Sequence, residues 1–455
     1  MKPFLAVAVA ALAPVLVVAQ NPYLGAVTTS ETQTEYTLGL KESIERGLKY
    51  NLGAELAGEA QRSARGQRLV ALSRLLPNIN ARLQESSQKV NLAAFGLSMP
   101  GFPQTIGPFG LTDARAAVSQ QLLNFRALHQ SRAAVQEVKA AEFHYQDARE
   151  TVVSVVASLY LQAASGASRI EAVKAQLAAS QALFNQAVDF KKTGVVAGIE
   201  VLRAQVELQS QKQRLIAAQN DFEKQKLNLA RAIGLPDTAT VTLADSMPDG
   251  RNPLPSVAEA VQGALAGRKD IQSQEARVSA AELSLKAAHA GRLPTLAFNG
   301  DFGAIGPNPM NSRGTYTAAL ALNIPVWQGN RVKGESEEAD ANLRQLRAQL
   351  SELKARVGFE IRTAMLDLNA AREQLDVNRS AVNLAKQQEL QARDRFAAGV
   401  TNNLEVVQAQ EALAGANENY IASLYAFNAA KTMLARSMGA AESRLMEFLQ
   451  GGDRR

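Results

Sequence analysis

Histidine and cysteine are the residue types most often used for metal binding and nucleophilic chemistry, and this sequence offers little of either. It holds three histidines, His129, His144 and His289, which lie far apart on segments of helical pattern and lack HExxH spacing. It has no cysteine, which excludes thiolate metal sites, cysteine nucleophiles, disulfides and lipid anchoring through cysteine. No glycine-rich phosphate loop follows a strand, and no Gly-x-Ser-x-Gly motif occurs. We therefore expect no catalytic site, no metal and no cofactor, and we expect that the protein is not an enzyme.

The composition is typical of long helices. The chain has 455 residues, of which only 5% are aromatic, and it is rich in Ala, Leu, Gln, Glu, Lys and Arg. Aromatic residues usually supply much of a thick globular core, so their scarcity favours an extended helical protein. The 49 Lys and Arg against 43 Asp and Glu leave a formal charge of only +6, spread along the chain, and we expect no nucleic-acid partner.

Residues 1–19 have the pattern of a cleavable signal peptide. Lys2 provides the positive start, an apolar stretch follows, and Val17 and Ala19 are small residues suited to a cut before Gln20. The alternative is a membrane anchor, but about 15 apolar residues fall short of the ~20 that span a bilayer. No later segment reaches 18 continuous apolar residues, so we expect no transmembrane helix in the mature chain. Membrane embedding of the exported protein would then have to use strands.

The sequence contains an internal duplication. Residues 194–234 and 399–439 match at a constant offset of 205, with 15 identities over 41 positions. A weaker match relates residues 74–83 to 291–300. We therefore expect a first repeat over 38–235 and a second over 257–439, joined by a linker at 236–256 that is rich in Pro, Asp and Gly. An N-terminal segment, 20–37, and a C-terminal tail, 440–455, complete the chain.

Each repeat shows the same order of elements. A helix, over 38–75 or 257–290, precedes a β-hairpin at about 77–124 or about 294–327, where apolar and polar residues alternate. A long helical hairpin follows, at about 126–233 or about 331–437, with its turn at Gly194 or Gly399. Two helices joined by a short turn must be antiparallel neighbours.

Four amphipathic strands cannot stand alone, because open edges and apolar faces need partners. The sequence shows no other strands for a second sheet, although an ordinary soluble core is the alternative use of the apolar residues. A barrel built from several chains, with apolar residues facing lipid and polar residues facing water, fits the export signal better. Phe125 and Trp327 sit where a strand meets a long helix, either in an interfacial aromatic girdle or in ordinary packing.

The chain resembles the TolC-like outer membrane factors of Gram-negative bacteria. The resemblance runs from SIERGLKYN (43–51) to LARSMG (434–439), and its most specific pieces are the duplication, LNIPVWQGNR (322–331) and RFAAGVTNNLEVVQAQ (395–410). It implies a homotrimer in the outer membrane, with a 12-stranded transmembrane β-barrel and a 12-helix tunnel in the periplasm. It further implies an exit duct for a tripartite efflux pump or type I secretion system. Energy would come from an inner-membrane transporter, which reaches the duct through a periplasmic adaptor.

The resemblance also implies the site residues. In the family, acidic residues after the turn line a constriction at the periplasmic tip, and Glu405 and Gln408 stand at matching positions, with Glu200 and Arg203 in the first repeat. Three Glu405 side chains would form an anionic ring that favours cations. The alternative is a simple helix N-terminal acid, with Asn402 or Asn403 as cap. Adaptor docking would use the tip turns, at Gly194, Val195, Gly399 and Val400.

A soluble periplasmic coiled-coil adaptor or scaffold is the rival interpretation. It explains the helices and the export signal but leaves the two strand pairs without a role. Neither interpretation identifies the transported substrate.

Overall fold

The computed structural model describes residues 21–28, 34–96, 101, 103–250 and 255–450, so the predicted signal peptide lies outside the described residues. The chain forms two units. The first combines residues 1–55, 151–249 and 371–429, and the second combines 56–150, 250–370 and 430–455. Two long helices, α3 (Phe125–Lys192) and α7 (Arg331–Ala397), contribute to both.

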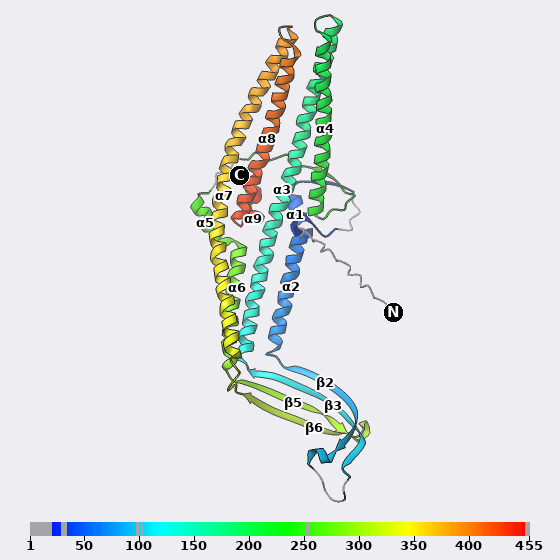
Figure 1. Ribbon diagram of the computed structural model, residues 1–455, viewed down its shortest axis with the longest axis vertical. Coiled ribbons are helices and arrows are strands. Elements are labelled where there is room, and N and C mark those ends of the chain that lie inside the picture. Colours follow the sequence, from blue (N-terminus) through cyan, green and yellow to red (C-terminus); the bar gives the residue numbers. More distant parts are fainter. Residues whose placement is uncertain (1–20, 29–33, 97–100, 102, 251–254, 451–455) are drawn as a thin grey trace, which may run out of the picture. The chain divides into compact units, whose positions relative to one another are not determined.

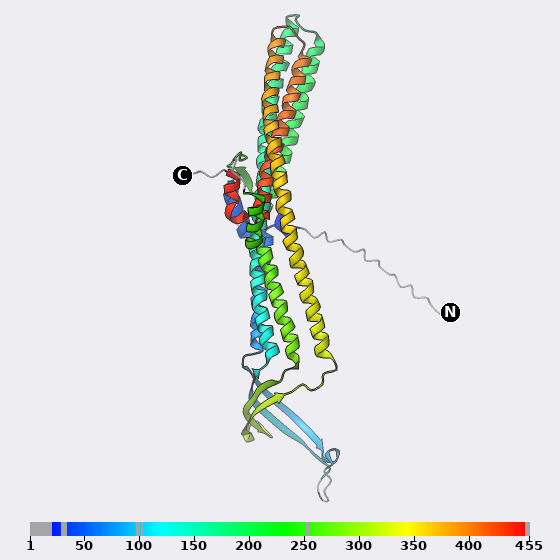
Figure 2. The same ribbon diagram turned by 90° about the vertical axis from the view of Figure 1, so that its left-hand side faces the viewer.

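The second unit contains a four-stranded antiparallel sheet, which Figures 1 and 2 show from two sides. Its strands are β2 (Asn78–Asn91), β3 (Thr105–Leu123), β5 (Thr295–Gly306) and β6 (Arg313–Asn323), in the order β2-β3-β5-β6. The hairpins of the two repeats meet where β3 pairs with β5. Strands β2 and β6 are therefore the sheet edges, and neither has a further partner among the described residues.

The pairing register places like residues on one face. Leu83 lies opposite Ala114, Ala116 opposite Phe302, and Phe302 opposite Tyr316. Because side chains alternate along a strand, these residues share one face, which we call the apolar sheet face. The other face carries polar residues, including Arg115, which forms ion pairs with Asp113 at 2.7 Å and Asp301 at 2.8 Å.

Helices complete the second unit. They are α2 (Leu52–Ser73), α5 (Val257–Gly267), α6 (Lys269–His289), α9 (Ala441–Gln450) and parts of α3, α7 and α8. Ser256 begins α5 with a capping box, since its hydroxyl accepts from Glu259 N–H and the Glu259 carboxylate accepts from Ser256 N–H. A small apolar core joins α5, α6 and α7 through Ala260, Ala264, Ile271, Val357 and Ile361.

The first unit holds a second, smaller sheet. Strands β1 (Glu35–Leu38) and β4 (Thr240–Leu243) pair in parallel, and α1 (Leu40–Tyr50) follows β1. The Tyr160 hydroxyl on α3 ties this sheet to the helix, because it donates to the Leu38 carbonyl (3.2 Å) and accepts from Asp245 N–H (3.1 Å). Burial raises the pKa of Tyr160 to about 12, still further above physiological pH than its ordinary value.

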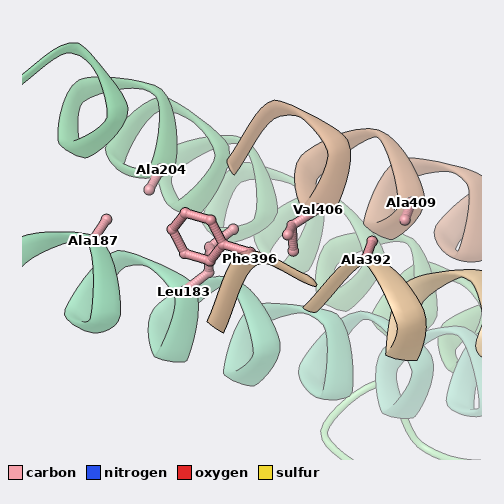
Figure 3. Packing of buried hydrophobic residues seen from close by; sticks show 7 residues of the cluster. All are labelled: Leu183, Ala187, Ala204, Ala392, Phe396, Val406 and Ala409. Atoms are coloured by element: carbon pink, nitrogen blue, oxygen red, sulfur yellow. The ribbon is translucent and has the colours of Figure 1, made fainter. Parts of the chain in front are cut away.

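Two helical hairpins pack together in the first unit. Helix α4 (Gly198–Ala232) returns from α3, and α8 (Asn403–Ser437) returns from α7. Near the turns the four helices share a core in which Phe396 is the largest buried side chain (Figure 3). Alanines surround it, and its ring centroid lies 5.6 Å from that of Phe190. Small residues let helices approach closely, which is why so few aromatic residues suffice.

The duplication reappears in the element boundaries. Helices α4 and α8 end 205 residues apart, whereas α1 and α5 begin 217 residues apart, so the extra residues of the first repeat lie in its β-hairpin. Asn51 and Arg268 interrupt the helices at equivalent places with nearly the same backbone angles. Both side chains donate to the last residue of a long helix: Asn51 to the Ala232 carbonyl at the end of α4, and Arg268 to the Ser437 carbonyl at the end of α8, each at 3.0 Å.

Several boundaries differ from the sequence expectations. The prediction of no further strands is wrong, because β1 lies in the N-terminal segment 20–37 and β4 in the linker 236–256. Four-residue strands beside Pro and Asp leave too short an alternation to recognise. The stretches 38–75 and 257–290 each hold two helices, and the tail 440–455 contains α9, whose Leu445 and Leu449 are buried.

Among the described residues, one helix, α3, is long and apolar enough by composition to cross a membrane, which the sequence analysis did not expect. In the structure 61% of its most apolar stretch is buried within the protein. Val152, Val156 and Leu161 are fully covered there, so packing accounts for the apolar composition of this stretch.

Candidate functional site

The two tip turns, residues 193–197 and 398–402, have the same hydrogen-bond pattern. Gly194 N–H donates to the Lys191 carbonyl and Val195 N–H to the Phe190 carbonyl; Gly399 and Val400 donate in the same way to Phe396 and Arg395. This is the Schellman arrangement, in which the C′ residue adopts a left-handed conformation. Both glycines have positive φ, 77° and 70°, which explains why glycine stands at these positions.

The Glu405 carboxylate is held across the second tip turn. It accepts from Arg395 Nη1 at 2.8 Å and from the Thr401 hydroxyl at 2.6 Å. Arg395 belongs to the last turn of α7 and Glu405 to the first turn of α8, where their charges also match the two helix dipoles. Leu404 N–H donates to the Asn402 side-chain oxygen at 3.2 Å, so Asn402 has the capping role considered for either asparagine. Glu405 is therefore ion-paired within its own hairpin.

Its counterpart in the first repeat, Glu200, lies in a different environment. Its side chain is nearly buried and accepts from Arg203 Nη1 at 2.8 Å, while its second carboxylate oxygen has no hydrogen-bond partner. Asn403, which is fully buried, donates from Nδ2 to the Glu200 carbonyl at 2.6 Å. This contact ties the start of α8 to the start of α4 and brings the two tips together.

The remaining predicted tip residues are on the surface. Gln408 is exposed one turn beyond Glu405, and Val195 and Val400 present apolar side chains to solvent beside the turn glycines. No hydrogen bond or ion pair joins the side chains of Glu200 and Glu405 in the described part of the chain. The structure thus unites the two turns through Asn403 without forming a carboxylate cluster.

The apolar sheet face is the second candidate functional surface. Its large side chains are strongly exposed, Leu83 and Tyr316 both to 79%, while the opposite face is polar. Trp327 is also exposed to 80% just after β6, and Phe125, at the start of α3, is partly exposed. A continuous exposed apolar surface of this kind marks a contact with lipid or with another protein.

Sequence reasoning considered Asn403 only as a helix cap, and it did not predict the partners that Arg395, Thr401 and Asn403 find at the tips. Arg395 and Thr401 lie in a recognised tip segment, and a basic residue before the turn with an acid after it could have suggested the pair with Glu405. Asn403 gave no such signal, because its partner is a main-chain carbonyl in the other repeat.

The histidines do not converge. His289 Nδ1 lies 3.3 Å from the Ser336 hydroxyl on a neighbouring helix, an ordinary structural contact. Within the described ranges no group of three or more His, Asp or Glu side chains could hold a metal ion.

Comparisons with known proteins agree with this geometry. The family model described as "Outer membrane efflux protein" matches residues 56–235 and 260–440, which covers both repeats and omits the linker. The pyoverdine export outer membrane protein OpmQ of Pseudomonas putida is 25% identical over 315 residues, spanning 67% of this chain and 64% of that protein. SepC of Pseudomonas putida, a probable efflux pump outer membrane protein, is 22% identical over 88% of this chain and 83% of its own.

Solved structures share the fold. The Campylobacter jejuni CmeC outer membrane channel superposes with a TM-score of 0.76 at 18% identity, over 99% of this chain and 96% of that chain. The Vibrio cholerae outer membrane protein VceC gives a TM-score of 0.74 at 20% identity, over 88% and 96%. The fold is that of these outer membrane channels, as the sequence predicted. The match to the outer membrane efflux protein family sets aside the rival interpretation as a soluble coiled-coil scaffold.

Proposed function

The chain belongs to the outer membrane efflux protein family, and from that premise we propose that it is the outer membrane exit duct of a tripartite efflux pump or type I secretion system. In this role a periplasmic adaptor and an inner-membrane transporter deliver substrate to the duct, which conducts it to the outside. The duct itself performs no chemistry and needs no cofactor. Its cargo is set by the transporter, since relatives of similar identity are named for pyoverdine and for toluene.

The observation that carries the proposal is the two-faced sheet. An exposed apolar face opposite a polar face is the arrangement of a barrel wall between lipid and water. Open edges at β2 and β6 would leave backbone groups unsatisfied in lipid, so the sheet must close on further strands. Three chains of four strands supply a 12-stranded barrel, and we propose this homotrimer. Phe125 and Trp327 then belong to the aromatic girdle at its inner rim.

The tip turns are the proposed adaptor contact. Val195 and Val400 are exposed beside Gly194 and Gly399, where α3 turns into α4 and α7 turns into α8. Around the same tips we propose the constriction, with one Glu405 from each of three chains and Gln408 one turn beyond. Because Arg395 pairs with each Glu405, such a ring would carry less negative charge than three free carboxylates.

Reconstitution into planar bilayers tests the duct. The purified full chain should migrate as a trimer that heating converts to monomer, and it should produce discrete conductance steps. A chain that fractionates with the soluble periplasm and adds no conductance would contradict the proposal.

A further inference from the structure

A cavity of about 330 Å³ lies between α3, α4 and α8 in the first unit. Small residues make the room for it, with Ala172 on α3 and Ala414 and Gly415 on α8. A Cβ atom added at Gly415 would meet no other atom within 4 Å, so the space beside this glycine is open. The volume is that of a small-molecule site, for which roughly 300–1,000 Å³ is usual. None of the tip or sheet residues described above lines it.

Two ion pairs stand in the walls of the cavity. Arg169 Nε on α3 donates to Glu418 Oε2 on α8 at 2.8 Å, and Arg214 Nη2 on α4 donates to Glu411 Oε1 at 3.1 Å. Each arginine is therefore balanced by a carboxylate of α8. The charges of the walls cancel, and the charge inside the cavity depends on what lies behind them.

Two buried glutamines also line the cavity. Gln176 is 6% exposed and donates from Nε2 to the Gln410 carbonyl at 2.8 Å, while Gln211 is 1% exposed and donates from Nε2 to Glu207 Oε1 at 2.7 Å. In the described part of the chain neither glutamine side-chain oxygen accepts a hydrogen bond. Buried amide oxygens usually have a donor, so a donor-bearing ligand in the cavity would complete both residues.

Glu207 adds a negative charge behind Gln211. Its side chain is buried, its residue is 6% exposed, and within the described ranges it forms no ion pair. Buried carboxylates are usually paired with a cation, because burial without one is costly. Among the residues that line the cavity or bond to its lining side chains, three carboxylates stand against two arginines. One negative charge is left in excess, which favours a cation.

We propose that this cavity binds a small amphiphilic amine. Its ammonium group donates to the side-chain oxygens of Gln176 and Gln211, and the unpaired Glu207 balances its charge. Its apolar part lies against Val173 and Ala414, which line the same cavity. This site is distinct from the tips and from the sheet, and it does not depend on the proposed exit duct.

A thiol placed in the wall of the cavity reports on binding, because the chain has no cysteine of its own. Asn417 lines the cavity, so Asn417→Cys in the purified full chain is modified with a methanethiosulfonate reagent. We expect 2-phenylethylamine to slow this modification at least fivefold, in a saturable way. The neutral 2-phenylethanol, of nearly the same shape, should slow it little. Glu338→Cys, exposed on α7 outside the cavity, should be modified at one rate throughout.

Three variants, each combined with Asn417→Cys, test the assignment. Gly415→Leu fills the open space and should abolish the protection by the amine, whereas Gly415→Ala adds only a Cβ there and should keep it. Both substitutions raise helix propensity, so neither should unfold α8. Glu207→Gln keeps an acceptor for Gln211 and removes the excess charge, so the amine should bind about tenfold more weakly.

Other outcomes would overturn the site. Equal protection by the alcohol and the amine would refute the preference for a cation. Protection that survives Gly415→Leu, or that appears equally at Glu338→Cys, would place the amine elsewhere. Bilayer conductance separates this inference from the duct: a conducting chain without protection loses only the amine site, and protection in a non-conducting chain counts only against the duct.

Discussion

Replacing Arg268 should loosen the C-terminal end of α8, the second helix of the second helical hairpin. Its guanidinium is buried, donates to Asp270 (2.7 Å) and Glu360 (2.6 Å), and also donates to the Ser437 carbonyl. Losing one partner of a buried ion pair costs about 3–5 kcal/mol. Asp270 and Glu360 are partly exposed and can regain water, so for Arg268→Met we expect the lower figure, about 3 kcal/mol. That is roughly a hundredfold increase in local opening.

Hydrogen exchange of the purified protein, resolved by mass spectrometry, measures this opening at residues 434–438. Arg444→Ala is the matched control, since it removes an exposed ion pair with Glu447 in the same unit and should change exchange little. Asn51→Ala should instead loosen the end of α4, where Asn51 holds the Ala232 carbonyl. Wild-type exchange at 434–438 in Arg268→Met would refute the proposed anchoring role of this side chain.

Three further predictions concern the charged and turn positions. Gly399→Ala should destabilise the second tip turn by about 1–2 kcal/mol, because the backbone at Gly399 has a positive φ that alanine adopts poorly, although the space around it is free. Gly358→Ala is the control: this glycine lies inside a helix with free space around it, so the substitution should leave the turn unchanged. Hydrogen exchange at the tip compares the two variants. Arg395→Ala should free Glu405 and increase block by divalent cations in bilayers, whereas unchanged block would argue against a Glu405 ring. Acid should loosen the Arg268 contact. Burial alone would raise the pKa of Asp270, but the hydrogen bonds and charge of Arg268 outweigh it and lower that pKa. The stabilisation that the Asp270–Arg268 contact provides is therefore complete above the ordinary aspartate pKa of about 4 and is lost as the pH falls through the lowered value. Hydrogen exchange at residues 434–438, corrected for the intrinsic rate, that stays constant down to pH 3 would contradict this.

Local pattern was sufficient for the large elements. Period-two alternation placed both β-hairpins, and the long runs free of proline placed the helical hairpins, with turn glycines that the structure shows at positive φ. The short strands β1 and β4 were not predicted, because each buries only one or two side chains and their pairing joins residues about 200 positions apart. The helix interruptions at Asn51 and Arg268 escaped because their cause is a distant carbonyl that the local sequence does not reveal.

The environments of the tip residues Glu200 and Glu405 likewise could not be predicted from the sequence. Glu200 and Glu405 occupy equivalent positions in the repeat, yet one is nearly buried and the other is bridged by Arg395 and Thr401. Equivalent residues differ because Asn403 of α8 packs against the start of α4 beside Glu200, whereas Arg395 and Thr401 of the second hairpin itself hold Glu405.

By itself the sequence determined the duplication, the element order and the family resemblance, since these depend on composition and on periodicity within single segments. Only the tertiary structure decided which of two identical residues is covered. Ile216 and Ile421 share a residue type and a place in the repeat, so no local rule separates them. Their difference comes from the packing of helices in three dimensions, which covers one of the two residues and leaves the other exposed.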